Sequence, residues 1–149
     1  MSTTELAREL EIMHDTYFQQ FVELSGMINR QGEDAVLLEI RQWNELEEEP
    51  LTPMILVEEM GLTSGRVANI LRGLEQKQLI RRTRDGTDGR KVHISLTDTG
   101  MTQAQQLMDD IHSRNVALLD ALGEPDSKEL LRLLRKLVYV LVTRSTEES

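Results

Sequence analysis

Cysteine is absent from the 149 residues of the chain. Its absence excludes structural disulfides, thiolate metal sites, nucleophilic thiols and thiol-based redox sensing. Long apolar runs are also missing, since the longest stretches, such as 138–142, are far too short to span a bilayer. The first eight residues lack a basic region followed by an apolar one, so no signal peptide is expected. The sequence predicts a cytoplasmic protein without membrane contact.

Catalytic and metal-binding motifs are equally scarce. No glycine-rich phosphate loop, metalloprotease helix or Gly-x-Ser-x-Gly elbow is found, which argues against an enzyme. The three histidines are His14, His93 and His112, and only Asp109 with His112 forms a pair spaced for metal binding on one helix. We therefore predict no catalytic residues, no metal site and no cofactor, although a contribution of His14 or His112 to a metal site stays open.

Positive charge is concentrated in one segment of an acidic chain. The formal net charge is −9, yet residues 63–96 hold eight basic and three acidic side chains, a net charge of +5. The remaining residues therefore carry −14. Such segregation predicts one surface that faces a polyanion, on a body that repels it. A solvated basic face without a ligand is the alternative that charge alone leaves open.

Apolar periodicity predicts helices along the first half of the chain. Spacings of three and four predict a long amphipathic helix over about 4–30 and a second over about 34–44. Thr52 and Pro53 are typical of a helix start, and Gly61 is suited to end the short helix that follows. A further helix, capped by Thr63 or Ser64, is expected to run to about residue 78 with one apolar stripe. Two helices joined by a tight turn predict a helix-turn-helix.

The second half predicts a hairpin followed by two helices. Residues 79–84 and 91–96 are strand candidates around a turn-rich loop. Thr97 is suited to cap a long helix, which Gly123 to Pro125 would break, and Asp126 or Ser127 would start the last helix. The expected buried stripe of the long helix consists of Met101, Ala104, Met108, Ile111, Leu118 and Leu122. The last helix carries two apolar stripes, which together form a wider apolar face than contact with a single neighbouring element would cover.

Four segments together carry a family resemblance: 62–64, 74–82, 88–92 and 96–100. They resemble the signature of the MarR (multiple-antibiotic-resistance regulator) family, with Gly89 in the loop as a mild departure. The resemblance implies a single domain over 1–149, mainly α-helical with a small β-hairpin wing. Residues 34–97 would form a winged helix-turn-helix DNA-binding lobe. Residues 1–31 and 98–149 would form dimerisation helices.

The resemblance also implies roles at the DNA. The helix from Ser64 to Gln78 would enter the major groove, where arginine reads guanine and asparagine reads adenine. Arg90 would enter the minor groove, and Asp88 would hold Arg90 or brace the loop. Arg81 and Arg82 are alternatively ion-pair partners with a structural role. The complete predicted set of DNA-binding residues is Thr63, Ser64, Arg66, Asn69, Arg72, Arg84, Asp88, Arg90 and Lys91.

The terminal helices predict a homodimer, because they carry more apolar surface than a small wing domain can cover. A dimer would read a pseudo-palindromic operator at the nucleoid, most simply as a repressor. The resemblance further implies a small-molecule effector, whose candidate pocket residues are Met13, His14, Tyr17, Phe21 and Trp43. Aromatic and methionine side chains at helical spacing are, however, usually core.

Two other functions stay open. A winged-helix module that binds another protein is one, and the basic segment argues against it because interaction-only wings tend to lose their basic residues. A small enzyme is the other, and the missing motifs argue against it. The sequence therefore predicts a sequence-specific DNA-binding transcriptional regulator.

Overall fold

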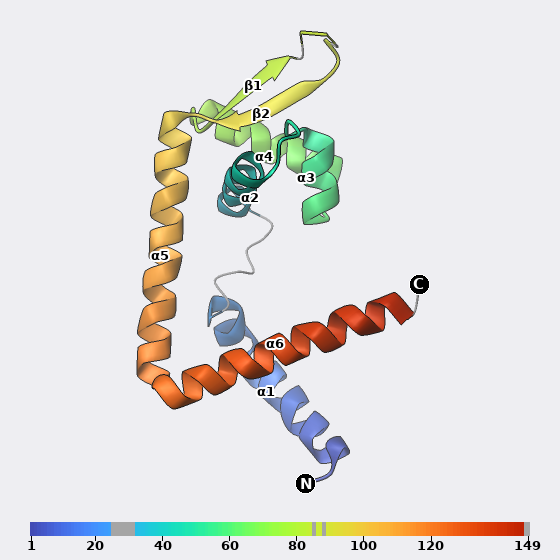
Figure 1. Cartoon of the computed structure of the whole chain (residues 1–149), viewed down its shortest axis with the longest axis vertical. Helices are drawn as coiled ribbons and strands as arrows, with labels where there is room; N and C mark the ends of the chain where they lie inside the picture. Colours follow the sequence, from blue (N-terminus) through green and yellow to red (C-terminus); the bar gives the residue numbers. More distant parts are fainter. Residues whose placement is uncertain (25–31, 85, 88, 148–149) are drawn as a thin grey trace. The chain divides into compact units, whose positions relative to one another are not determined.

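The computed structural model describes residues 1–24, 32–84, 86–87 and 89–147 (Figure 1). Two compact units divide the chain, Met1–Met108 and Asp109–Ser149. The described elements, in chain order, are α1 (Thr3–Leu24), α2 (Glu33–Leu46), α3 (Pro53–Met60), α4 (Ser64–Gln76), β1 (Ile80–Arg84), β2 (Val92–Leu96), α5 (Asp98–Leu122) and α6 (Glu124–Glu147). The order of helices and hairpin is the predicted one.

The hydrophobic core of the first unit lies among α2, α3, α4 and the hairpin, which we call the lobe. Each element contributes apolar side chains from one face only, and a fully buried side chain of this kind contributes about 1.5–3 kcal/mol. The core side chains of these elements are Val36, Leu37, Ile40, Leu56, Val67, Ile70, Leu71, Leu74, Ile80 and Ile94. Packing within the lobe therefore determines which face of α4 remains exposed to solvent.

Local capping sets the ends of α3 and the start of α4, as the sequence predicts. The hydroxyl oxygen of Thr52 accepts a hydrogen bond from the Ile55 N–H, and Pro53 occupies the first turn. Gly61 ends α3 in the left-handed region, with φ 62°. Thr63, rather than Ser64, caps α4 by accepting a hydrogen bond from the Arg66 N–H at 3.2 Å.

The hairpin is tied to the segment before α3. Strands β1 and β2 pair antiparallel, with Arg82 opposite Ile94 in the register. The N–H of Ile94 donates to the carbonyl oxygen of Leu51 at 2.8 Å, so β2 is bonded on both of its edges. Only Ile94 of β2 is fully buried, whereas its other residues are half-buried, so the alternation expected from the sequence is weak.

One helix boundary differs from the predictions, and another stays untested. The expected extension of the first helix from residue 25 to about residue 30 lies outside the described residues, and within α1 Tyr17 has non-helical dihedral angles. Helix α6 begins at Glu124 instead of Asp126 or Ser127, because Gly123 (φ 88°) alone makes the break. Proline is tolerated in the first turn, where its missing N–H leaves no hydrogen bond unmade, so Pro125 does not delay the helix.

The predicted buried stripe of α5 is wrong for several of its members. Ala104 is buried, but Met101, Met108 and Leu122 are each more than 40% exposed within the chain. The reason is that α5 approaches the lobe through its small residues: Gly100 and Ala104 are buried there. None of the helices in the described part of the chain combines the length and the apolar character needed to cross a bilayer.

Candidate nucleic-acid interface

Helix α4 has one buried face and one outer face. Val67, Ile70, Leu71 and Leu74 are buried in the lobe. The opposite residues are exposed, and we call them the outer face of α4: Ser64, Gly65, Arg66, Asn69 and Arg72. The helical repeat of 3.6 residues produces this division from the sequence alone. The helix therefore presents polar and cationic groups to solvent on a rigid support.

Two residues of the outer face are linked to each other. A guanidinium nitrogen of Arg72 (Nη1) donates to the side-chain oxygen of Asn69 at 2.9 Å. This i, i+3 contact holds the two side chains side by side. Arginine has five N–H donors, so Arg72 keeps donors for a further acceptor such as a phosphate.

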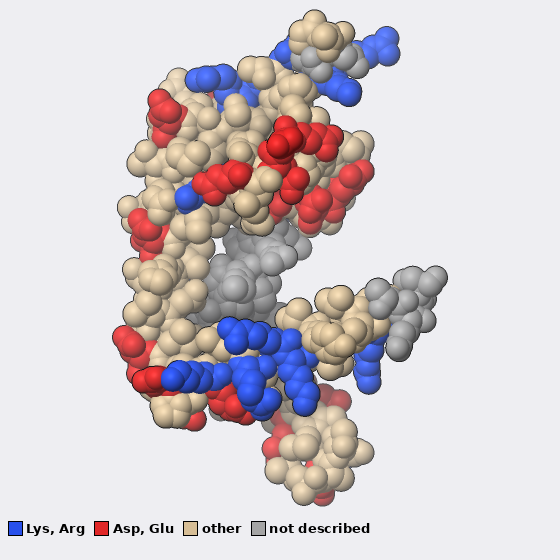
Figure 2. Space-filling view, in the orientation of Figure 1, with Lys and Arg blue, Asp and Glu red and all other residues tan. Residues whose placement is uncertain are grey.

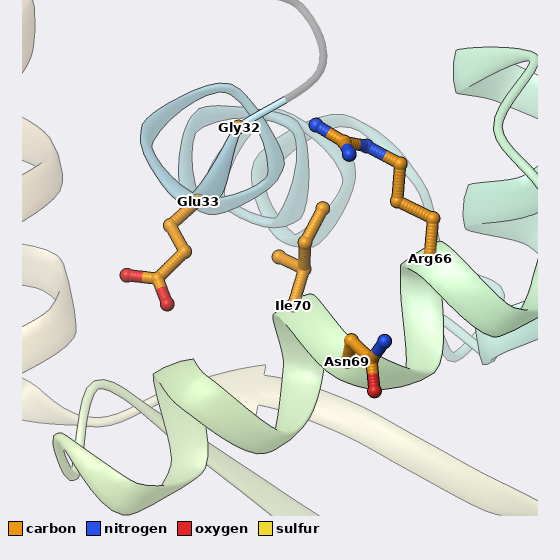
Figure 3. A pocket seen from close by; sticks show the side chains of 5 residues that line it. All are labelled: Gly32, Glu33, Arg66, Asn69 and Ile70. Carbon is orange, nitrogen blue, oxygen red and sulfur yellow. The ribbon is translucent and has the colours of Figure 1, made fainter.

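Arg66 has different surroundings from those expected. With Gly32, Glu33, Asn69 and Ile70 it lines an open pocket between the first turn of α2 and α4 (Figure 3). Figure 3 shows its side chain reaching toward α2, while Asn69 points away from it. Arg66 is exposed at this rim. The two predicted base-reading residues thus both border this pocket, but their side chains point in different directions.

The arginines of β1 are exposed but not equivalent. Arg82 forms an ion pair with Glu75 of α4, with 2.9 Å between Nε and Oε2. The predicted role of Arg82 as an ion-pair partner is therefore confirmed, whereas the same role for Arg81 stays a prediction. Arg84 donates to the carbonyl oxygen of Gly89 at 3.4 Å, a weak contact across the loop between the strands.

The wing, defined as β1, β2 and the loop between them, gathers cations at the edge of the lobe. Arg90 and Lys91 are exposed there. Figure 2 shows Lys and Arg over the hairpin and Asp and Glu over α2 and α3. Asp88 lies outside the described residues, so its predicted interaction with Arg90 stays a prediction. The wing and the outer face of α4 carry seven of the eight basic side chains of residues 63–96, and Lys77 at the end of α4 is the eighth.

Glu33 and Lys77 form an ion pair that the sequence did not predict. The Lys77 ammonium, at the end of α4, contacts the Glu33 carboxylate at the start of α2. The two residues are 44 positions apart, so no local pattern signals the contact. Gly73 in the middle of α4 is the one feature that could have indicated a close neighbour.

A second basic stripe, also missed from the sequence, follows α6 (Figure 2). Its members are Lys128, Arg132, Arg135 and Lys136, at spacings that share one side of a helix. Lys128 pairs with Glu124, and hydrogen bonds from Arg132 lower the pKa of Glu129. Local acids thus partly neutralise this stripe.

The predicted effector residues lie on two helices. Met13, His14 and Tyr17 are exposed on α1, and the side chain of Phe21 lies outside the described residues. The indole N–H of Trp43 on α2 donates to the Glu49 carbonyl oxygen at 2.8 Å, and Trp43 packs against the core. The pocket stays a prediction. Among residues 1–24, 32–84, 86–87 and 89–147, no three His, Asp or Glu side chains gather as a metal site would require.

Helix α3, the turn at Gly61 to Thr63, helix α4 and the hairpin after it define a winged helix-turn-helix. Residues 38–91 match the model of the MarR family. HTH-type transcriptional regulator MgrA of Staphylococcus aureus is 37% identical over 93 residues, which cover 62% of this chain and 62% of MgrA. Within this segment the chain is similar to members of the MarR family. It spans less than two thirds of the length of the curated relatives that it matches, 62% for MgrA.

Solved structures share the fold over most of the chain. YusO from Bacillus subtilis superposes with a TM-score of 0.69 at 23% identity, over 93% of this chain and 99% of YusO. The Staphylococcus aureus MepR–DNA complex gives a TM-score of 0.54 at 23% identity, over 94% of this chain and 98% of MepR. MepR bound to ethidium bromide gives the same score at 22% identity, over 95% and 97% of the two chains. These likenesses establish the fold.

Proposed function

We propose that the chain is a sequence-specific regulator of transcription that binds double-stranded DNA and has no enzymatic activity. The observation that carries this proposal is the outer face of α4, where exposed Arg66, Asn69 and Arg72 stand opposite a fully buried apolar face. A helix of this shape fits a major groove, and arginine and asparagine are the side chains that read guanine and adenine there. The regulator MgrA and the DNA-bound structure of MepR support the same function.

The wing would contribute the second contact. We infer that Arg90 enters the minor groove, whose narrow A/T-rich tracts concentrate negative potential. Arg84 and Lys91 on the same hairpin would contact phosphates, which fix the position of the protein without reading sequence. Thr63 and Ser64 begin α4 and would lie where a helix N-terminus approaches a phosphate.

The active form would be a homodimer on a pseudo-palindromic operator. Apolar side chains of α6 such as Leu137, Val138 and Leu141 are more than half exposed in the isolated chain. Contiguous apolar surface of this extent is rare on soluble monomers, and a second copy of the chain is its simplest cover. Half-sites would lie about one helical turn apart. Bound at a promoter in the nucleoid, such a dimer would block polymerase and act as a repressor.

A small-molecule effector would release the dimer from DNA. The MepR structure with ethidium bromide supports a ligand of aromatic character. Met13, His14, Tyr17, Phe21 and Trp43 are the residues we propose near it. A ligand can act only if it binds one spacing of the two lobes better than the other. A panel of phenolic and aromatic compounds tests this in two assays, a thermal shift and release from DNA, and a negative result in both would remove the proposal.

The central experiment selects duplexes from a randomised pool with the full-length chain and then measures affinity against salt. We expect one enriched pseudo-palindrome and a log affinity that falls by about 0.9 per log unit of salt for each neutralised phosphate. Arg90→Ala should weaken binding strongly without unfolding the chain, whereas Arg114→Ala, the same charge change on α5, should not. If no sequence is enriched and binding ignores salt, the protein-interaction function becomes the better explanation.

A further inference from the structure

The carboxylate of Glu33 occupies the space beside helix α4 that a Cβ atom at residue 73 would otherwise fill. A Cβ atom at Gly73 would meet the carboxylate oxygen Oε1 of Glu33 at 2.3 Å, far inside van der Waals contact. The other carboxylate oxygen, Oε2, pairs with the ammonium of Lys77, one helical turn further along α4. The first turn of α2 is thereby attached to the C-terminal half of α4.

The glycine itself calls for an explanation, because glycine in a helix interior costs about 1 kcal/mol relative to alanine. Gly73 does not adopt the left-handed conformation that would require it, unlike Gly61 and Gly123. Space for the Glu33 carboxylate is a structural reason for a glycine at this position.

The charges of this contact are also placed favourably on their own helices. Glu33 is the first residue of α2, where the helix dipole favours a negative group. Lys77 is the C-cap of α4, where the dipole favours a positive group. The ion pair therefore joins two helix ends that each stabilise their charge.

We propose that Glu33, Gly73 and Lys77 form a clamp that positions the recognition helix α4 for DNA. The clamp fixes the orientation of α4 relative to α2 and hence the angle at which Arg66 and Asn69 meet base edges. It also keeps the Lys77 ammonium engaged with a carboxylate instead of a phosphate. Glu33 is thus a positioning residue, and this role rests on the proposed DNA-binding function.

A positioning role and a simple surface charge predict different effects of removing Glu33 on the preference for the selected duplex. If Glu33 only repelled phosphates, removing it would raise affinity for every duplex alike. If it positions α4, removing it should lower the preference for the selected duplex over bulk DNA. Without its carboxylate partner, Lys77 should meanwhile raise the affinity for non-specific DNA and steepen the salt dependence of that affinity.

The test uses the full chain, the duplex that the wild-type chain selects, and sheared genomic DNA as the non-specific probe. Gly73→Ala should expel the carboxylate yet leave the fold intact, since alanine favours helix. We expect it and Glu33→Ala each to lower the ratio of selected to non-specific affinity about threefold, the scale of a partly exposed ion pair. Glu58→Ala, an equal charge change at an exposed position of α3, should leave the ratio unchanged.

The double variant Glu33→Ala with Gly73→Ala separates the clamp from helix propensity. Once the carboxylate is gone, the added methyl group meets nothing, so Gly73→Ala should cause no further loss of the ratio. An unchanged ratio in Gly73→Ala, or an equal further loss in the Glu33→Ala background, would overturn the clamp. A wild-type chain that selects no duplex would overturn the DNA-binding function itself, which is a different result.

Discussion

The hydroxyl group of Thr97 donates a hydrogen bond to the carbonyl oxygen of Gln78 at 2.6 Å. The same oxygen atom of Thr97 accepts a hydrogen bond from the Gly100 N–H at 3.0 Å and so caps α5. Gln78 lies in the left-handed region, with φ 59°, directly after the last turn of α4. One threonine therefore connects the end of α4 with the beginning of α5.

Replacing Thr97 tests this connection. Thr97→Val keeps the shape of the side chain but removes both hydrogen bonds, so the free energy of unfolding should fall by about 1–2 kcal/mol. Urea unfolding followed by circular dichroism measures the change. Thr99→Val, at an exposed position two residues on, should change stability by less than about 0.5 kcal/mol. Equal effects of the two variants would mean that the Thr97 contacts contribute nothing.

Gly100 is a site where a methyl group does not fit. A Cβ atom there would lie 1.9 Å from the carbonyl oxygen of Leu79, and a backbone atom cannot simply swing aside. Gly100→Ala should therefore lower stability by about 1–3 kcal/mol, although alanine is the better helix former. Thermal unfolding measures this loss.

Gly65 is the matched control for that substitution, since a Cβ atom there meets no described atom within 4 Å outside its own helix. Gly65→Ala should raise stability by up to about 1 kcal/mol. A stabilised Gly100→Ala variant would show that α5 and Leu79 can move apart.

The salt dependence of DNA binding should distinguish the arginines of β1. Arg84→Ala should lower the slope of log affinity against log salt by about 0.9, the value for one lost phosphate contact. Arg82→Ala should change the slope less, because Arg82 pairs with Glu75. Fluorescence anisotropy over a salt series gives both slopes. The reverse order would show that the Arg82 ion pair opens on DNA.

The apolar side of α6 should determine the oligomeric state. Leu141 is 57% exposed in the chain, so Leu141→Glu should leave the isolated fold unharmed. A buried charge at a dimer interface is costly, and sedimentation at micromolar concentration should show this variant as a monomer. Lys136→Glu introduces the same side chain on the basic stripe of α6 and should stay dimeric. A monomeric wild-type chain would contradict the proposed dimer.

Sequence patterns predicted the parts of this fold that local chemistry determines. Thr52, Pro53, Gly61 and Thr63 act within a few residues of themselves, and their roles as caps and stops are confirmed. The division of α4 into two faces follows from the helical repeat and is likewise confirmed. The helix-turn-helix and the hairpin also followed from periodicity and turn residues, and the family resemblance added the roles expected of them at DNA.

Contacts between segments that are distant in the sequence could not be predicted from these local patterns. The Glu33–Lys77 ion pair depends on how α2 packs against α4, and the exposure of Met101 depends on α5 approaching through Gly100 and Ala104. An apolar stripe indicates that a face will be covered, but it does not say whether the cover is the same chain. For this reason the apolar spacing of α5 did not indicate which of its residues are buried within the chain.

The hydrogen bond from Ile94 to Leu51 has a mechanical consequence. It joins the second wing strand to the residues that lead directly into α3, while β1 follows α4 without a flexible connection. The hairpin is consequently held to the rest of the lobe along both edges of β2. In the proposed dimer, a signal that abolishes binding would therefore act by changing the separation between the two lobes, each moving as a unit.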